Sequence, residues 1–206
     1  RIQTVSVEGE NQAFMVDGTK IYVAVPKGVG QGVSIQVASV DGFSDDGGKF
    51  SYNQPTVNRV RGCEPSIEFP KRTENCPANT DVRLTIEGHY FGPGKTTPHI
   101  IVGSSICRDV AHDPSTPDEV IECTLDSNTK ATGGWLALTV LAKNQLSETQ
   151  SLVRYEACKP GSVGETSALC QPCAVGKYAA SYGLSVCTDC SYGKFARPIN
   201  NCIWWS

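Results

Sequence analysis

Ten cysteines stand out in this sequence, because thiols can bind metals, take part in redox reactions or cross-link the chain as disulfides. They are Cys63, Cys76, Cys107, Cys123, Cys158, Cys170, Cys173, Cys187, Cys190 and Cys202. Two pairs near the C-terminal end have the C-x-x-C spacing that zinc ligands or a redox dithiol would use. In an oxidising compartment the same residues would instead pair completely as disulfides. Zinc binding, thiol redox chemistry and structural disulfides are therefore the three candidate chemistries.

The C-terminal cysteines belong to a sequence unit that occurs three times. The units are "CKPGSVGETSALC", "CAVGKYAASYGLSVC" and "CSYGKFARPINNC", and each opens with Cys-x-x-Gly. The C-x-x-C pairs then mark the borders between units, whereas a four-cysteine zinc site would leave Cys158 and Cys202 unused. We expect disulfides because each unit holds too few apolar residues to form a core. Pairing within each unit is favoured, which gives Cys158–Cys170, Cys173–Cys187 and Cys190–Cys202. An interlaced pairing of 170–187 with 173–190 remains open.

No other residues form a convincing catalytic or metal-binding motif. His89, His99 and His112 are far apart in sequence, and no HExxH, G-x-S-x-G, P-loop or dinucleotide pattern occurs. The segment "DVAHDPSTPDE" (109–119) is acidic, so weak calcium binding by Asp109, Asp113 and Asp118 stays open, although a solvated loop explains the charge more simply. A thioredoxin-like dithiol would need a βαβ context that is missing. We expect a protein that is not an enzyme and has no cofactor.

The first 155 residues alternate between apolar and polar positions, as β-strands do. Examples are "TKIYVAVP" (19–26), "VSIQVASV" (33–40), "VRLTIEGHYF" (82–91) and "WLALTVLA" (135–142), with Gly, Pro, Asn and Asp between them. No stretch of a dozen residues has a helical period. The sequence therefore predicts an all-β protein, with Ig-like β-sandwiches in tandem followed by a small disulfide-rich module that has little core.

An internal repeat divides the chain. Residues 20–55 and 119–158 share the same order of strands and turns, and each ends on an aromatic, in "FSY" or "VRY". Some 50 residues cannot close an Ig-like sandwich of about 100. We therefore expect residues 1–54 to be the C-terminal part of one sandwich, with its missing strands ahead of Arg1. Residues 55–156 would be a complete sandwich and residues 157–206 the cysteine-rich repeats.

Several motifs of the second unit resemble the IPT/TIG family, the Ig-like domains of plexins, growth-factor receptors, fibrocystin-like proteins and Rel transcription factors. The matching motifs are Pro55-Thr56-Val57, "LTIEGHYFG" (84–92), Val102-Gly103, the pair Cys107 and Cys123, and Val153-Arg154-Tyr155. The resemblance implies an Ig-like fold with a Cys107–Cys123 disulfide and with Phe91 turned into the core. The segment "CEPSIEFPKRTENC" (63–76) is longer than the family's opening loop, and its two cysteines most simply bridge the loop to itself. The C-terminal units resemble the cysteine-rich repeats of Eph-type and TNF-type receptors.

The overall charge restricts the partners. A formal net charge of −3 without a basic run gives no reason to expect nucleic acid or membrane contact, and no apolar run is long enough to span a bilayer. A Rel-like DNA-binding module and a cytosolic zinc protein are therefore the weaker alternatives. We expect protein partners, including neighbouring copies of this chain, and we expect Trp204 and Trp205 to lie at an interface. The favoured function is a structural or adhesive segment of a large extracellular surface or filament protein; the alternative is the ligand-binding ectodomain of a plexin-like or other cell-surface receptor.

Overall fold

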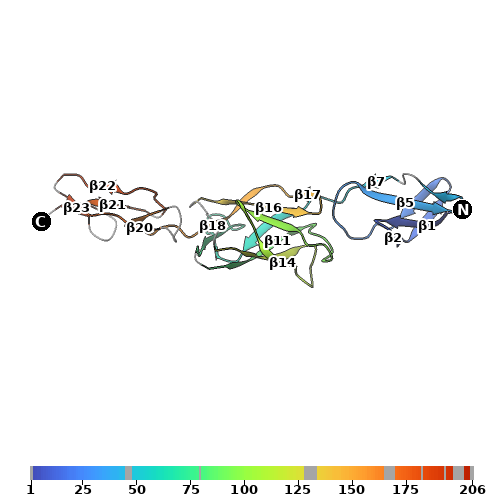
Figure 1. The fold of residues 1–206 in the computed structure, drawn as a ribbon, viewed down its shortest axis with the longest axis horizontal. Coiled ribbons are helices and arrows are strands. Elements are labelled where there is room, and N and C mark those ends of the chain that lie inside the picture. The colour runs from blue at the N-terminus through green and yellow to red at the C-terminus, as the bar shows by residue number, and fades with distance from the viewer. Residues whose placement is uncertain are drawn as a thin grey trace.

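The computed structural model describes residues 2–44, 48–78, 80–127, 134–164, 170–181, 183–192, 194–196 and 202–204. Across these residues the protein is built of strands, turns and loops, with no helix. Three bodies follow one another along a long axis, and the two chain ends lie at its opposite ends (Figure 1). We call them the first unit (residues 2–54), the central sandwich (55–156) and the tail (157–204). The predicted all-β fold is confirmed.

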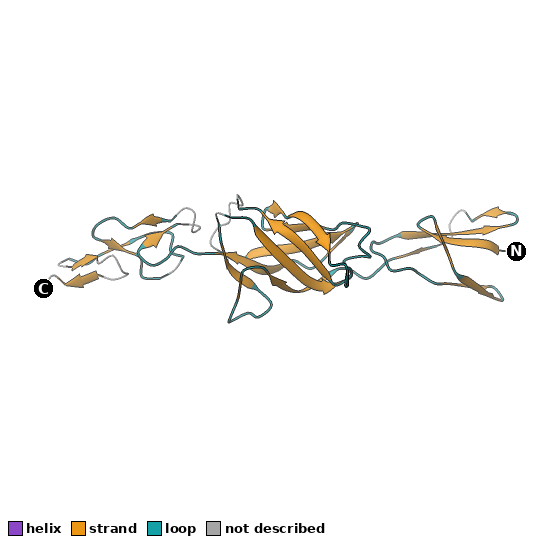
Figure 2. Ribbon diagram, turned by 90° about the horizontal axis from the view of Figure 1, so that it is seen from below, coloured by secondary structure: helices purple, strands orange, loops and turns teal. Residues whose placement is uncertain are grey.

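The central sandwich consists of two facing sheets (Figure 2). One sheet has the order β13-β12-β16-β18-β10-β9, with β17 paired to β16, and the other has the order β14-β15-β11-β8. All pairings are antiparallel except that of β10 with β18. The first sheet contains β9 (Glu64–Pro65), β10 (Thr73–Cys76), β12 (His99–Val102), β13 (Ser105–Ile106), β16 (Leu136–Ala142), β17 (Gln145–Leu146) and β18 (Gln150–Tyr155). The second contains β8 (Thr56–Arg61), β11 (Val82–His89), β14 (Arg108–His112) and β15 (Val120–Leu125).

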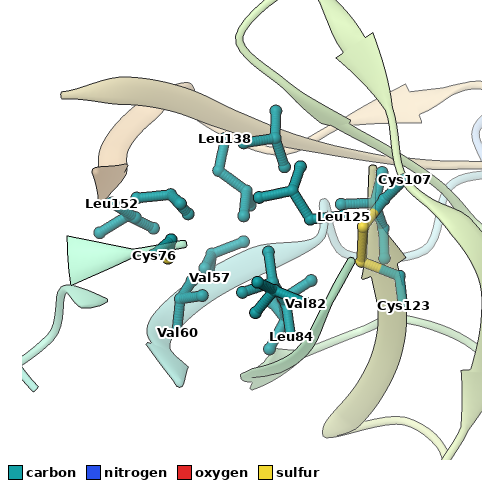
Figure 3. Packing of buried hydrophobic residues seen from close by; sticks show 14 of the residues in the cluster. Val57, Val60, Cys76, Val82, Leu84, Cys107, Cys123, Leu125, Leu138 and Leu152 are labelled. Carbon is teal, nitrogen blue, oxygen red and sulfur yellow. A yellow bond between two sulfur atoms is a disulfide. The ribbon is translucent and has the colours of Figure 1, made fainter. Parts of the chain in front are cut away.

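Alternate side chains of these strands fill the space between the sheets. In β11 the buried positions are Val82, Leu84, Ile86 and Gly88, with more exposed residues between them. Side chains from the opposite sheet, among them Leu138, pack against this row (Figure 3). Because side chains of a strand point to opposite faces in turn, the alternation read from the sequence places one face of each strand in the core.

The end of β11 turns a large aromatic into this core. The pairing of β11 with β8 shifts register between Glu87 and Gly88, and Tyr90 takes the left-handed backbone conformation with φ of 65°. Phe91 is thereby fully buried, as the sequence predicted. The bulge depends on glycine, because a side chain on Gly88 would meet the neighbouring strand.

The first unit is smaller and has a five-stranded sheet and a separate hairpin. The sheet has the order β2-β1-β5-β6, with β7 also paired to β5, and β3 pairs with β4 alone. The strands are β1 (Ile2–Val7), β2 (Glu10–Gln12), β3 (Phe14–Asp17), β4 (Lys20–Val23), β5 (Val33–Ser39), β6 (Gly42–Phe43) and β7 (Lys49–Phe50).

The second half of the first unit repeats the hydrogen bonds of the central sandwich. The Val37 amide donates to Ser44 Oγ (3.1 Å) and the Ser44 amide donates to the Val37 carbonyl (2.8 Å). At the same spacing further along the chain, Val140 and Ser147 make the same pair of bonds (2.9 and 2.8 Å). Strands β5, β6 and β7 therefore correspond to β16, β17 and β18.

A tyrosine closes both of these halves in the same way. The Tyr52 hydroxyl donates to the Pro26 carbonyl (2.9 Å), and the Tyr155 hydroxyl donates to the Asp126 carbonyl (3.1 Å). The two tyrosines are the final aromatics of the "FSY" and "VRY" motifs. The internal repeat seen in the sequence is thus also a repeat of backbone and hydroxyl hydrogen bonds.

The repeat extends further toward the N-terminus than the sequence indicated. Val7 pairs with Glu10 across a tight turn as Val102 pairs with Ser105, so β1 and β2 correspond to β12 and β13. The hairpin β3–β4 likewise corresponds to β14–β15. Neither β2 nor β14 shows apolar alternation, because both are edge strands with mostly exposed side chains. For the same reason the segment 109–119 is not wholly a loop, since β14 occupies its first part.

The described residues of the tail form three two-stranded hairpins in series. They are β19 (Ser162–Val163) with β20 (Gln171–Pro172), β21 (Lys177–Tyr178) with β22 (Thr188–Asp189), and β23 (Lys194–Ala196) with β24 (Cys202–Trp204). The same backbone hydrogen bond closes each Cys-x-x-Gly opening: the amide after the glycine donates to the carbonyl of the residue after the cysteine. These bonds run from Ser162 to Lys159 (3.0 Å), from Lys177 to Ala174 (3.0 Å) and from Lys194 to Ser191 (3.1 Å). Glycine fits the third position of such a turn, and the φ values of Gly161 and Gly176 are 88° and 84°.

Candidate interaction surfaces

The joint between the first unit and the central sandwich is held by two side-chain amides. Gln145 accepts a hydrogen bond from the Gly30 amide and donates one to the Tyr52 carbonyl, both at 2.9 Å. Asn144 accepts from the Gln31 amide (2.9 Å) and donates to the Gln31 carbonyl (3.1 Å). Because each side-chain amide has both a donor and an acceptor, the two side chains satisfy backbone N–H and C=O groups of the first unit. The turn between β16 and β17 thus fixes the end of the first unit.

Packing and charge add to this joint. Val29 is buried and faces Gly92, and Lys143 forms an ion pair with Glu8 of the first unit. Burial, and secondarily the negative charge of Glu8, raise the pKa of Tyr52. A cavity of 310 Å³ lies beside these residues and is lined by both units.

The sequence did not reveal the joint. Lys143, Asn144 and Gln145 have the composition of an ordinary hairpin turn, and nothing in their spacing indicates contact with residues more than a hundred positions earlier. Lys143 takes a φ of 56°, which turns usually assign to Gly or Asn, so its residue type gives no signal of this conformation.

A stack of aromatic rings and cations covers one end of the central sandwich. The guanidinium carbon of Arg72 lies 4.1 Å from the ring centre of Phe69 and 4.9 Å from that of Trp135. Arg154 lies 4.8 Å from the same Trp135 ring and forms an ion pair with Glu74. Trp135 lies just before β16, and its cation–π contacts hold the loop 63–76, here called the inserted loop, against the sheet.

A groove of 450 Å³ runs beside this stack. It is lined by the inserted loop on one side and by the start of β18 on the other: Glu68, Phe69, Pro70, Lys71, Arg72, Gln150, Ser151 and Leu152. Ile67, at the tip of the loop, is almost fully exposed. The segment that departs from the IPT/TIG pattern therefore also lines this open groove.

The tail is attached to the sandwich without a spacer. The Glu156 amide donates to the Cys76 carbonyl (2.8 Å), and the Gly183 amide donates to the Cys158 carbonyl (2.9 Å). Cys76 and Cys158 are both buried. The second hairpin of the tail thus folds back onto the point where the tail begins.

Disulfides occur in the central sandwich and in the tail. The observed pairs are those that the sequence favoured: Cys63–Cys76, Cys107–Cys123, Cys158–Cys170 and Cys173–Cys187. Cys107 follows β13 and Cys123 lies in β15, so this bond ties the two sheets together (Figure 3). Cys190 is also disulfide-bonded. The side chain of Cys202, its expected partner, lies outside the described residues, as do the side chain of Trp204 and all of Trp205.

The acidic segment uses its carboxylates to cap backbone amides. Asp113 accepts hydrogen bonds from the amides of Thr116 (2.9 Å) and Ser115 (2.8 Å), which lower its pKa, and Asp118 accepts one from the Gly92 amide (2.9 Å). Among the described residues, no three or more His, Cys, Asp or Glu side chains are grouped as a metal site would require. No helix long and apolar enough to cross a membrane occurs in the described part either.

The comparison with protein families matches the central sandwich. Residues 70–157 fit the family described as "IPT/TIG domain", while the search of curated proteins found no match for the chain. The matched stretch begins inside the inserted loop, includes both Cys107 and Cys123, and ends just after Tyr155. The resemblance that the sequence motifs indicated is therefore confirmed for this stretch: residues 70–157 are similar to IPT/TIG domains and have their Ig-like fold.

Proposed function

We propose that this chain is a non-enzymatic structural or adhesive segment of a large extracellular surface or filament protein. IPT/TIG domains mediate contacts between proteins in receptors and transcription factors, and the central sandwich is similar to them. The observation that carries the proposal is the end-to-end arrangement of three bodies, with the chain entering at one end and leaving at the other (Figure 1). Such an arrangement transmits a connection over a distance rather than enclosing a substrate.

The construction of the joints supports this function. Both amide groups at the first joint bind backbone on the opposite unit, and the tail starts two residues after the sandwich's last strand. Short, hydrogen-bonded connections oppose bending, whereas domains linked by long flexible segments move freely. A stiff segment suits a load-bearing or spacing role.

The cysteine chemistry supports an extracellular location. Disulfides persist in secreted and surface proteins and are reduced in the cytosol. The tail depends on them, because its described residues bury only Cys158 and Ala179. Its similarity to receptor cysteine-rich repeats belongs to the proposal as well.

Purified chain from an oxidising expression host tests the proposal. Complete pairing of ten cysteines lowers the intact mass by about 10 Da relative to the reduced protein, because each disulfide removes two hydrogens. Small-angle scattering should show that the chain is rod-shaped. Sedimentation over a concentration series should show association of the chain end to end with its own copies, or with protein partners in a surface extract. Free thiols or stoichiometric zinc would contradict the extracellular proposal.

One observation favours the alternative, a ligand-binding receptor ectodomain. The groove beside Arg72 is open and lies on the inserted loop rather than at a joint. The Arg72→Ala variant separates the two functions. If the groove binds a ligand, the unaltered chain binds to cells and the Arg72→Ala variant does not. If the segment is structural, neither chain binds to cells, and the variant keeps the rod dimensions and self-association of the unaltered chain.

A further inference from the structure

Both ring nitrogens of His112 face backbone carbonyl oxygens. Nδ1 lies 2.5 Å from the Pro117 carbonyl oxygen, and Nε2 lies 2.7 Å from the Thr96 carbonyl oxygen. A carbonyl oxygen can only accept a hydrogen bond, and a neutral imidazole ring has a single N–H group. Both contacts are therefore hydrogen bonds only when the ring carries a second proton and is an imidazolium cation.

The two carbonyl groups belong to different loops. Pro117 lies in the loop between β14 and β15, whereas Thr96 lies in the loop between β11 and β12. The same loops also meet at Asp118, whose carbonyl oxygen accepts from the Phe91 amide (3.1 Å) and whose carboxylate accepts from the Gly92 amide (2.9 Å). The imidazolium ring thus adds a link between two loops that already touch at one end.

The loop that carries Thr96 forms part of the joint between the first unit and the sandwich. Pro93, Lys95 and Thr96 line the 310 Å³ cavity of the joint together with residues of the first unit. At the start of this loop, a Cβ atom built on Gly92 would lie 3.2 Å from the Val29 side chain of the first unit. A change in how firmly the loop is held therefore changes one wall of the joint.

Ionisable groups of both signs lie on the elements around the ring. They are Arg108 and Asp109 in β14, Asp113, Asp118 and Glu119 in the loop that follows, Glu122 in β15, Lys95 in the loop of Thr96, and Lys27 in the first unit. Arg108 forms an ion pair with Asp81, and Glu122 forms one with Arg83. Carboxylates and ammonium groups ordinarily change charge outside the range from about pH 5.5 to about pH 8, whereas histidine changes charge within it. In this set, a mild change of pH therefore acts on His112.

We propose that His112 is a proton-dependent clamp on the joint. In mild acid the imidazolium ring donates to both carbonyl groups and fixes the loop of Thr96 against the loop of Pro117. In mild base the ring has lost one proton, one of the two bonds is gone, and this wall of the joint is looser. The segment is therefore stiffer at about pH 5.5 than at about pH 8.

The bond that is lost on deprotonation is the one to Thr96. The Pro117 contact is the shorter of the two and is partly buried, while the Thr96 contact is exposed to solvent. The remaining N–H group therefore stays on Nδ1, and the bare Nε2 atom then places a lone pair against the Thr96 oxygen. Water can replace the ring at that oxygen, so the loop next to the first unit is the one that is released.

The clamp goes beyond the proposed function. It rests on the geometry of two loops and the joint and not on an extracellular location. A structural segment without a clamp and a clamp in a protein of another function are both consistent with the geometry, so either conclusion can fail alone.

Amide exchange at two pH values tests the clamp on the 206-residue chain. After correction for the intrinsic exchange rate at each pH, the Gly92 amide should be about tenfold more protected at about pH 5.5 than at about pH 8. Small-angle scattering should show a narrower range of lengths at the lower pH. The His112→Gln variant has a side chain that cannot become charged, so it should show neither change.

His99→Gln is the matched control. His99 is exposed on β12, and its ring makes no hydrogen bond to any residue that the structure describes, so this variant should keep the pH response of the unaltered chain. Ring signals of the unaltered chain give a readout that does not depend on the stability of a variant. In nitrogen-resolved NMR spectra at about pH 5.5, both ring N–H protons of His112 should be visible, because carbonyl oxygens hold them, while those of His99 exchange with water.

Three results would overturn the proposal. The first is equal protection of the Gly92 amide at the two pH values. The second is a pH response that the His112→Gln variant keeps or that the His99→Gln variant loses. The third is exchange of the His112 ring protons with water as fast as that of the His99 ring protons.

Discussion

The carbonyl oxygen of Thr56 occupies the place where a side chain of Gly88 would begin. A Cβ atom built on Gly88 would lie 1.9 Å from that oxygen and 2.6 Å from the Phe91 ring. Strands β8 and β11 therefore approach at this bulge more closely than any residue with a side chain allows. The glycine of the "EGHYFG" motif is required by contact with a neighbouring strand as well as by the turn that follows.

Gly88→Ala should destabilise the central sandwich by about 3 kcal/mol or more, because the backbone of β8 or the ring of Phe91 must move to accommodate the methyl group. Urea unfolding followed by tryptophan fluorescence measures the change. Gly134→Ala is the control, since a Cβ there has no heavy atom within 4 Å. Equal midpoints for the two variants would show that the strands can separate at little cost.

Gln145→Ala should loosen the joint between the first unit and the sandwich. The substitution removes the partners of the Gly30 amide and the Tyr52 carbonyl, at a cost of about 1–2 kcal/mol in the docked state. Exchange of the Gly30 amide should accelerate about tenfold, and scattering should show a broader range of lengths. Gln36→Ala, at an exposed position of β5, should leave both unchanged. A rigid rod in the Gln145 variant would mean that the Asn144 hydrogen bonds, the Lys143–Glu8 ion pair and the packing of Val29 are enough to hold the joint.

Removing the Cys173–Cys187 disulfide with alanine at both positions should unfold the second hairpin of the tail. The described tail has almost no buried apolar side chains to replace the lost cross-link. Loss of protection at the Cys190 amide, which donates to the Gly176 carbonyl (2.8 Å), reports this. The midpoint of the central sandwich should not change.

The matching change in the sandwich should have a different outcome. Alanine at both Cys107 and Cys123 should lower stability by about 3 kcal/mol but leave the fold intact, because the large core remains. Two results would contradict these roles. One is a tail whose amides stay protected from exchange without the Cys173–Cys187 bond, and the other is a sandwich that unfolds without the Cys107–Cys123 bond.

Asp81→Asn should reduce the loss of stability in acid. The Ser127 amide (3.0 Å), the Ser127 hydroxyl and Arg108 (2.8 Å) hold the pKa of the Asp81 carboxyl below its ordinary value of 3.8. A pKa lower in the folded than in the unfolded state adds stability above the unfolded value, and this contribution is lost as the pH falls through the folded value.

The effect is therefore confined to the region below about pH 4. Thermal unfolding of the sandwich between pH 7 and pH 2 measures it, and the variant should show the shallower decline. Asp113→Asn is a useful comparison, since backbone amides also lower the pKa of Asp113. An unchanged acid slope in the Asp81 variant would mean that its contacts do not persist in solution.

Local patterns determined much of this protein. Alternation in segments such as 82–91 and 135–142 was enough to predict the long core strands, because one buried face leaves a period of two in the sequence. The Cys-x-x-Gly units favoured a disulfide within each unit, because each unit holds too few apolar residues to form a core. The pairs formed by Cys158 and Cys173 followed from the same units.

Edge strands escaped prediction for the opposite reason. Strands β2 and β14 bury almost nothing, so selection for a core leaves no pattern in them. The contacts of Trp135 also left no local pattern, because its partners Arg72 and Arg154 lie elsewhere in the chain.

The all-β class, the repeat and the disulfide-bonded tail could be predicted from the sequence, because these features depend on residues close together in the chain or on periodic burial. The way in which the bodies join became visible only in the folded protein. Asn144 contacts Gln31 across more than a hundred residues. Contacts of this kind depend on which surfaces the fold brings together, and a hydrogen bond between distant residues leaves no periodic trace in either segment.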